Sequence, residues 1–166
     1  MDLLKAIKTR RSIREYKDGS IPREILADLI DAARFAPTAR NIQPWEFVVI
    51  TDKGVLDKIA QLAENGRFIS AAAACIGVFC ADTKYYLEDG SAATQNLLLA
   101  ASGYGIGSCW VAGDKKPYCG EVAGLLKAPH SLKLVSLVAL GYPASRDSFK
   151  EAPKKGLAQL IHWEKF

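Results

Sequence analysis

Apolar side chains recur at helical spacing in several stretches of the chain. The clearest stretch covers residues 22–36, whose single apolar stripe is formed by Ile25, Leu26, Leu29, Ile30 and Ala33. The charged residues of this stretch lie off the stripe, which is typical of a helix with one face on a core. Ser20 and Pro22 suit its first turn, and Pro37 ends it. Shorter amphipathic patterns cover residues 2–9, 53–64, 119–127 and 157–163.

Runs rich in β-branched and aromatic residues predict strands between these helices. Residues 45–51 (WEFVVIT) form the first such run. Residues 75–80 (CIGVFC) and 134–140 (LVSLVAL) are almost wholly apolar and predict buried strands, and residues 108–112 are a candidate short strand. Residues 87–103 combine helix formers with apolar side chains nearly all round, which predicts a central, buried helix.

These patterns give about four strands among five or six helices. The first two elements are both helical, so helices and strands do not follow a strict βαβ order. We therefore expect an α+β fold rather than a doubly wound sheet. The 166 residues contain no repeat, low-complexity tract or linker, and they fit one domain that covers residues 1–166.

The chain carries a modest positive charge of +4. Such an excess permits an anionic ligand or a nucleic acid and requires neither. The sequence does not open with the apolar segment of a secretory signal, and its longest uncharged run, residues 91–113, is too polar to span a membrane. We expect a cytoplasmic protein that does not bind to membranes.

The cysteines and histidines do not indicate a metal site. None of the four cysteines has a partner at C-x-x-C spacing, and His130 and His162 lie far from all of them in the sequence. Cys75 and Cys80 fall in an apolar run, where cysteine acts as a small core residue. We expect reduced, buried thiols and no metal.

The first candidate site is a basic segment after the first helix, Arg10-Arg11-Ser12-Ile13-Arg14. Three guanidinium groups this close together repel one another, and an anion among them would replace repulsion by charge-assisted hydrogen bonds. Arginine forks match phosphate oxygens, and Ser12 adds a hydroxyl donor. The segment alone is also compatible with a solvated basic turn or a nucleic-acid patch.

The second candidate is the polar loop between the helix at 22–36 and the strand at 45–51. Two prolines, Pro37 and Pro44, bracket this loop, and Pro44 keeps Gln43 away from the α region. Asn41 and Gln43 supply amide donors and acceptors that suit the edge of a planar heterocycle. Rigid polar loops between regular elements often form sites, although a plain connector would look similar.

The third candidate is the glycine-rich run Gly103-Tyr104-Gly105-Ile106-Gly107-Ser108. Glycine lets a backbone approach a ligand closely or adopt a positive φ. The run ends a helix instead of opening one, so it is not a dinucleotide fingerprint. A helix C-cap followed by a turn would account for the same pattern.

The order of these segments points to a family. The chain contains, in sequence, R-R-S-x-R, A-P-T-x-x-N-x-Q-P-W, the buried stretch ATQNLLLAA, G-x-G-S-C-W, G-Y-P and a terminal I-H-W. Along nearly its whole length it resembles the FMN-dependent nitroreductase family, particularly the short members. The resemblance implies a three-layer α+β sandwich, with a mixed or antiparallel central sheet flanked by helices. It also implies a domain-entwined homodimer with one FMN at each end of the subunit interface.

The same likeness assigns roles to the first candidate segment. Arg10 and Ser12 are expected to bind the FMN phosphate, with Arg11 in support. Arg14 is expected near the N1/O2 edge of the flavin, where a fixed guanidinium stabilises the negative charge of the reduced ring. Lys154 and Lys155 would complete the phosphate site, at a place where the family usually has an arginine.

The other two segments would surround the rest of the cofactor. The other subunit would contribute the loop residues Pro37, Thr38, Ala39, Asn41 and Gln43, which contact the ribityl chain or the ring. A backbone N–H group would point at flavin N5 or O4 from the segment over the flavin, formed by Ile106, Gly107 and Ser108. The chain lacks the helical excursion that larger relatives place above the flavin.

The implied reaction is a ping-pong transfer. NADH or NADPH gives a hydride to flavin N5 and leaves, and a small electron acceptor such as a nitroaromatic or a quinone takes its place. The cofactor carries the chemistry, so no catalytic side chain is expected. Two alternatives stay open: a flavin protein of the same fold with another role, such as dehalogenation or flavin breakdown, and a basic nucleic-acid-binding module.

Overall fold

The structure is a computed structural model that describes residues 2–145 and 148–166. One antiparallel sheet in the order β1-β2-β4-β3 forms its centre. The strands are β1 (Trp45–Ile50), β2 (Ala74–Ala81), β3 (Gly107–Ala112) and β4 (Leu132–Gly141). The two central strands are almost wholly buried, which explains why their sequences lack the alternation of a half-exposed strand.

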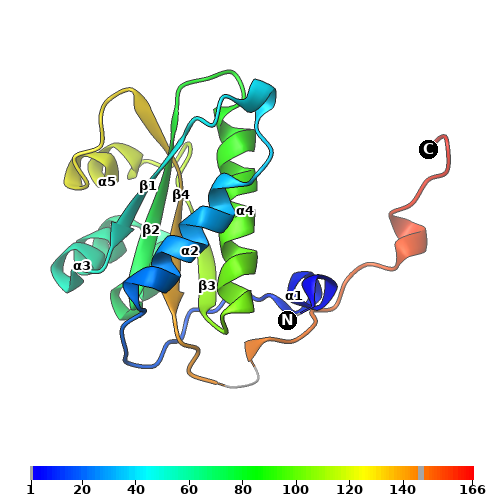
Figure 1. Cartoon of the computed structure of the whole chain (residues 1–166), viewed down its shortest axis with the longest axis horizontal. Helices are drawn as coiled ribbons and strands as arrows, with labels where there is room; N and C mark the ends of the chain where they lie inside the picture. The colour runs from blue at the N-terminus through cyan, green and yellow to red at the C-terminus, as the bar shows by residue number, and fades with distance from the viewer. Residues whose placement is uncertain (1, 146–147) are drawn as a thin grey trace.

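Helices cover both faces of this sheet (Figure 1). One face carries α2 (Arg23–Arg34) and α4 (Tyr86–Gly103). The other face carries α3 (Lys53–Leu62), the 3₁₀ segment η2 (Glu64–Ala71) and α5 (Cys119–Leu125). The predicted three-layer α+β arrangement is confirmed, and the central sheet is antiparallel.

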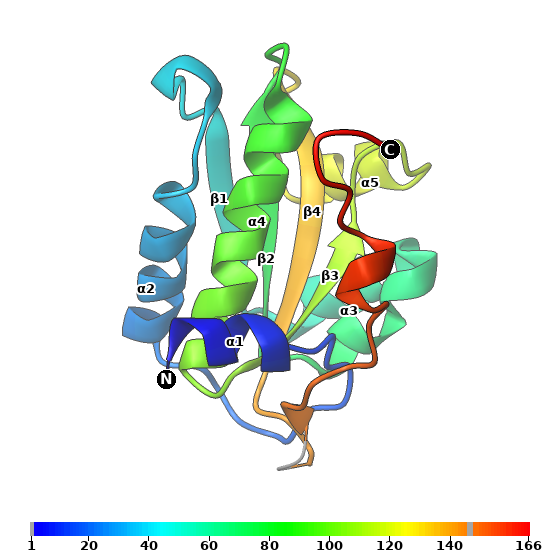
Figure 2. The ribbon, with the colours of Figure 1, turned by 90° about the vertical axis from the view of Figure 1, so that its right-hand side faces the viewer.

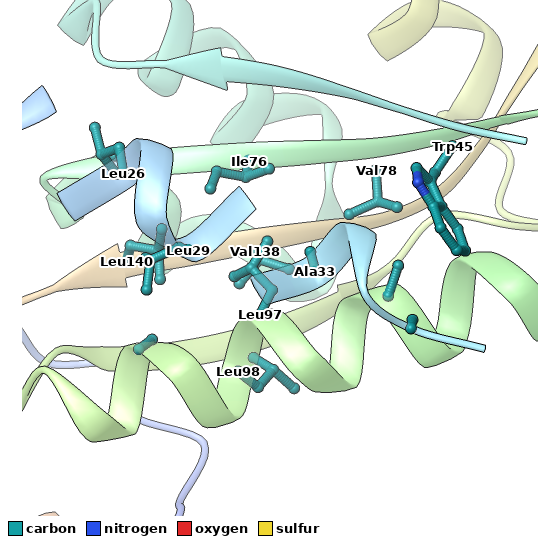
Figure 3. Close-up of a cluster of buried hydrophobic side chains, with 14 of the residues drawn as sticks. Leu26, Leu29, Ala33, Trp45, Ile76, Val78, Leu97, Leu98, Val138 and Leu140 are labelled. Atoms are coloured by element: carbon teal, nitrogen blue, oxygen red, sulfur yellow. The ribbon is translucent and has the colours of Figure 1, made fainter. Parts of the chain in front are cut away.

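Alternate residues of β2 face the two layers, because successive side chains of a strand point to opposite faces. Ile76 and Val78 pack beneath α2 and α4, together with Leu97 of α4 (Figure 3). Cys75 and Phe79 point into the second core, under α3 and α5. Both predicted core thiols are buried and unpaired, since Cys75 and Cys80 are free cysteines with no exposed surface.

Two terminal segments lie outside this three-layer body. Helix α1 (Leu3–Thr9) packs across the end of α4 (Figure 2). The chain after residue 150 extends away from the body and contains the short 3₁₀ turn η4 (Leu157–Gln159) (Figure 1). Both segments expose large apolar side chains: Leu3, Leu4, Ile7, Leu157, Leu160 and Trp163. Across the described residues, no helix combines the length and the apolar character needed to cross a membrane.

Candidate functional site

The basic segment after α1 runs beside β3. Ser12 forms a parallel bridge with Ser108, and the Ile13 N–H donates to the Ser108 carbonyl at 2.9 Å. Further along, the Lys17 N–H donates to the carbonyl of Tyr142 at 2.8 Å. The segment is therefore held against the start of β3 and the end of β4, and the first and third candidate segments lie side by side at one end of the sheet.

The glycines between α4 and β3 make this close approach feasible. A Cβ atom at Gly107 would lie 2.9 Å from Cγ2 of Ile13 and 3.2 Å from the Gly141 carbonyl oxygen. Gly105 has a φ of +70°, the left-handed conformation that favours glycine after a helix. Gly105 therefore makes the turn after the helix, and Gly107 allows β3 to pack closely against Ile13 and Gly141.

The arginines of the basic segment have no acidic partners among the described residues. Within residues 2–145 and 148–166, no carboxylate forms an ion pair with Arg10, Arg11 or Arg14. Burial raises the pKa of the Cys109 thiol, while the charge of Arg14, a hydrogen bond from Ser12 and the charge of Arg10 oppose the increase. Arg10, Arg14 and the Ser12 hydroxyl therefore all lie near the Cys109 thiol, and two guanidinium groups with a hydroxyl donor are the kinds of group that can hold the phosphate of an FMN molecule.

Local contacts hold this cationic group in place. The Tyr16 hydroxyl donates to the Ile13 carbonyl at 2.6 Å and braces the turn beneath the arginines. Arg14 donates to the Ser12 carbonyl at 3.4 Å, and its guanidinium lies 5.5 Å from the ring centre of Phe68. A guanidinium over an aromatic face is held there by the charge distribution of the ring.

The second candidate segment, the loop of residues 37–43, is tied to the first turn of α4. The Thr38 hydroxyl donates to the Asp89 carboxylate at 2.8 Å, and the Ala39 N–H donates to it at 3.2 Å. Thr38 also accepts a hydrogen bond from the Gln43 N–H at 3.2 Å, which joins the two ends of the loop. Asp89 is only 5% exposed, and it had not been singled out from the sequence.

Unusual backbone angles also mark this loop. Arg40, Asn41 and Gln43 all have φ values between +52° and +55°. The Gln43 side-chain amide donates to Oδ1 of Asn41 at 3.1 Å, so the two predicted amide side chains pair on the exposed side of the loop. Residues other than glycine are disfavoured at these positive φ values. Strained residues of this kind are concentrated at ligand-binding sites.

The first and second candidate segments lie far apart within one chain. The loop of residues 37–43 contacts the start of α4, and the segment of residues 106–108 follows its end (Figure 1). Helix α4 has 18 residues and is therefore about 27 Å long. One FMN molecule cannot reach both groups in a single chain.

The C-terminal lysines also lie outside the cationic group of this chain. Lys154 and Lys155 are exposed in the segment before η4, which extends away from the body of the chain (Figure 1). His130 and His162 are exposed too. The described residues contain no cluster of three or more His, Cys, Asp or Glu residues that could hold a metal ion.

These features define an α+β protein in which a group of arginines, without acidic partners among the described residues, lies beside the edge strand of the sheet. Residues 7–79 and 80–142 match the model of the nitroreductase family. The chain is 39% identical to the "Putative NADH dehydrogenase/NAD(P)H nitroreductase" of Archaeoglobus fulgidus, and the alignment covers 99% of both chains. The chain belongs to the nitroreductase family.

Solved structures agree with this assignment. A crystal structure of the same description from Parabacteroides distasonis superposes with a TM-score of 0.92 at 32% identity, covering 99% of this chain and 98% of that one. A "putative nitroreductase in complex with FMN" from Desulfovibrio desulfuricans superposes with a TM-score of 0.83 at 31% identity, covering 100% of this chain and 98% of that one. The family and the fold expected from the sequence are confirmed.

Proposed function

We propose that this protein transfers a hydride from NADH or NADPH, through bound FMN, to nitroaromatic, quinone or similar acceptors in a ping-pong reaction. Its class, an NAD(P)H-dependent oxidoreductase that uses FMN, follows from its family and from the names of its relatives. The acceptors and the order of steps are part of the proposal. The observation that carries it is the group of unpaired arginines beside the bridge between Ser12 and Ser108.

The residues at this end of the sheet would hold the phosphate. Arg10 and Ser12 both lie near Cys109, and Arg11 adds a further positive charge to the segment. Charge-assisted hydrogen bonds from these groups to a dianion are about twice as strong as neutral ones. Because β3 fixes the segment on one side, these donors need little rearrangement when the anion binds.

When bound, FMN supplies the redox chemistry by accepting a hydride from one substrate and giving it to the next. The chain contributes charge and position. Arg14, held over Phe68, would stabilise negative charge on the ring, and the segment of residues 106–108 would offer its backbone to the ring edge. No side chain in this group acts as a nucleophile.

The complete site would require two copies of the chain. Because Thr38, Ala39, Asn41 and Gln43 lie at the far end of α4 from Arg10, they would contact the flavin held by a partner subunit. Exposed apolar side chains support a homodimer: Leu3 is 66% exposed, Leu157 71% and Trp163 80%. Apolar surface of this kind on a soluble protein marks an interface.

Purified protein tests the proposal directly. We expect a yellow dimer whose flavin absorbance bleaches under anaerobic conditions with NADH or NADPH and recovers when a quinone or nitroaromatic is added. Colourless protein that takes up no added FMN would overturn the flavin assignment. If the protein binds FMN but neither NADH nor NADPH reduces it, the protein is a flavin protein with another role.

The arginine group is tested by substitution. Arg10→Ala should weaken FMN binding by about 1.5–3 kcal/mol, the usual contribution of a charged hydrogen-bond partner. The measurement is flavin fluorescence titration, with Arg23→Ala on the exposed surface of α2 as the matched control of equal charge. Unchanged FMN affinity in Arg10→Ala would show that the phosphate lies elsewhere.

A further inference from the structure

Phe68 is an aromatic residue whose ring meets one cation of the candidate site. It lies in η2, and its half-buried side chain packs against the second core, under α3 and α5. The Arg14 guanidinium lies 5.5 Å from the centre of the Phe68 ring. The two residues are distant in the sequence, so the fold alone brings them together.

The segment that carries Phe68 is packed tightly against β3. A Cβ atom at Gly66 would lie 2.9 Å from Cβ of Ala63 and 3.2 Å from Cγ1 of Val111, so η2 approaches β3 closely at this glycine. Ile69, the residue after Phe68, is fully buried. Side chains in close-packed surroundings have little freedom to move. The Phe68 ring therefore has a firm support on both sides in the sequence.

Arg14, by contrast, has few restraints apart from this ring. Its guanidinium donates to the Ser12 carbonyl at a long 3.4 Å, and no carboxylate of the described residues pairs with it. An arginine side chain is long and has many rotamers, so a weak contact leaves its direction undefined. An aromatic face within about 6 Å attracts a guanidinium. Among the described residues, Phe68 is therefore the contact best placed to fix the direction of the Arg14 guanidinium.

The direction matters because of where Arg14 lies. Burial raises the pKa of the Cys109 thiol and the charge of Arg14 opposes the rise, so the guanidinium lies near Cys109 in the first half of β3. The segment of residues 106–108 leads directly into this part of the strand. The cation held over Phe68 is therefore at the same end of the sheet as the other arginines and the glycine run.

We propose that Phe68 is a positioning residue, which holds the Arg14 guanidinium in one direction and thereby sets how strongly the protein favours reduced over oxidised FMN. The inference rests on the proposed function, in which Arg14 stabilises negative charge on the reduced ring. A charge stabilises a reduced cofactor best when it is already in place, because no reorganisation is then needed. A guanidinium that turns freely into water gives little of this effect. Phe68 acts through Arg14 alone.

The reduction potential of bound FMN, measured by anaerobic titration against a reference dye, tests this role. Arg14→Gln should weaken the preference for reduced over oxidised FMN about tenfold, which lowers the two-electron potential by about 30 mV. Phe68→Leu should weaken it about threefold, the effect of one cation–π contact at an exposed site. Phe68→Met, which removes the ring at similar volume, should do the same. Phe68→Tyr keeps the aromatic face and should restore the original potential.

A double variant separates positioning from packing. Because Phe68 acts through Arg14, adding Phe68→Leu to Arg14→Gln should lower the potential no further. Phe47→Leu is the matched control, since Phe47 is half-buried against the core under α2 and α4 and has no cation over its ring among the described residues. This control should leave the potential unchanged even if it lowers the melting temperature.

Three results would overturn the inference. An equal fall with and without Arg14, or an equal fall in Phe47→Leu, would show that Phe68 serves packing alone. A fall in Arg14→Gln with none in Phe68→Leu and Phe68→Met would show that Arg14 needs no such support. FMN content and bleaching by NADH or NADPH are measured on the same samples. Protein without FMN overturns the proposed function itself, whereas flavin-loaded, reducible protein whose potential ignores Phe68 overturns this inference alone.

Discussion

At the scale of single residues, Asp89 organises the loop of residues 37–43 more than any residue of the loop itself. Its carboxylate is buried, and both of its oxygens accept from the loop, one from the Thr38 hydroxyl and one from the Ala39 N–H. Three strained residues follow within five positions. The hydrogen bonds to a charged acceptor offset that strain and give the loop one conformation.

Asp89→Ala should release the loop. We expect the free energy of unfolding to fall by about 2–3 kcal/mol, because two donors lose a charged acceptor. FMN affinity should fall at least tenfold, since the loop would no longer be ordered where it meets the flavin. Thermal unfolding and fluorescence titration of FMN measure the two effects separately.

Asp89→Asn provides the matched control. The amide oxygen can still accept from the Ala39 N–H, so this variant should recover part of the FMN affinity. If Asp89→Ala lowers the melting temperature while FMN affinity well below that temperature is unchanged, Asp89 supports only the fold.

At the scale of elements, the close contact between the basic segment and β3 depends on the absence of a side chain at Gly107. Gly107→Ala would place a Cβ atom 2.9 Å from the branched side chain of Ile13, with little room to move. We expect a loss of about 1–3 kcal/mol in unfolding free energy and weaker FMN binding, because the arginines would shift with the segment.

Gly103→Ala, four residues earlier, is the control. Its added Cβ meets nothing within 4 Å and lies in the last turn of α4, so the protein should gain up to about 1 kcal/mol. Equal melting temperatures and FMN affinities for the two variants would contradict the packing argument. Urea unfolding and FMN titration provide the comparison.

Elements with a strong local pattern could be predicted from the sequence. The apolar stripe at 22–36 predicted α2, and the two apolar runs predicted the two central strands. In the structure each of these strands is longer than predicted by one or two residues at each end. The 3₁₀ segment η2 was missed because its apolar residues follow no clear period. Strand order and the bridge between Ser12 and Ser108 join residues distant in the sequence, which no local pattern encodes.

The candidate site was predictable in its parts and not in its assembly. The arginines and the loop stood out by charge and by proline spacing, and the structure brings the arginines to the glycine run. Asp89 escaped notice because an acid in the first turn of a helix is ordinary. Only its burial, and the 50 positions between it and Ala39, show what it holds.

At the scale of the whole molecule, the exposed C-terminal segment should determine assembly. Removal of residues 153–166 takes away several large apolar side chains that are exposed in the single chain. We expect the truncated protein to lose the dimer and its FMN together. Light scattering after size-exclusion chromatography measures the mass, and absorbance measures the flavin.

A double variant, Lys154→Gln with Lys155→Gln, separates the two roles of this segment. It keeps the apolar side chains, so the dimer should persist while FMN affinity falls about tenfold, the effect of a charged partner. A truncated protein that remains a flavin-loaded dimer would show that the segment contributes neither contact nor charge.

Asp89 lies in the first turn of α4 and Arg10 lies near the other end of this helix, and their separation has a genetic consequence in the proposed dimer. Each chain would give its arginines to one active site and its loop to the other. A homodimer of subunits with a defect only at Arg10 would then be inactive, and so would a homodimer of subunits with a defect only at Asp89. Paired together, one subunit of each kind would form one site built entirely from undamaged halves. Two defective alleles expressed in the same cell should therefore complement each other.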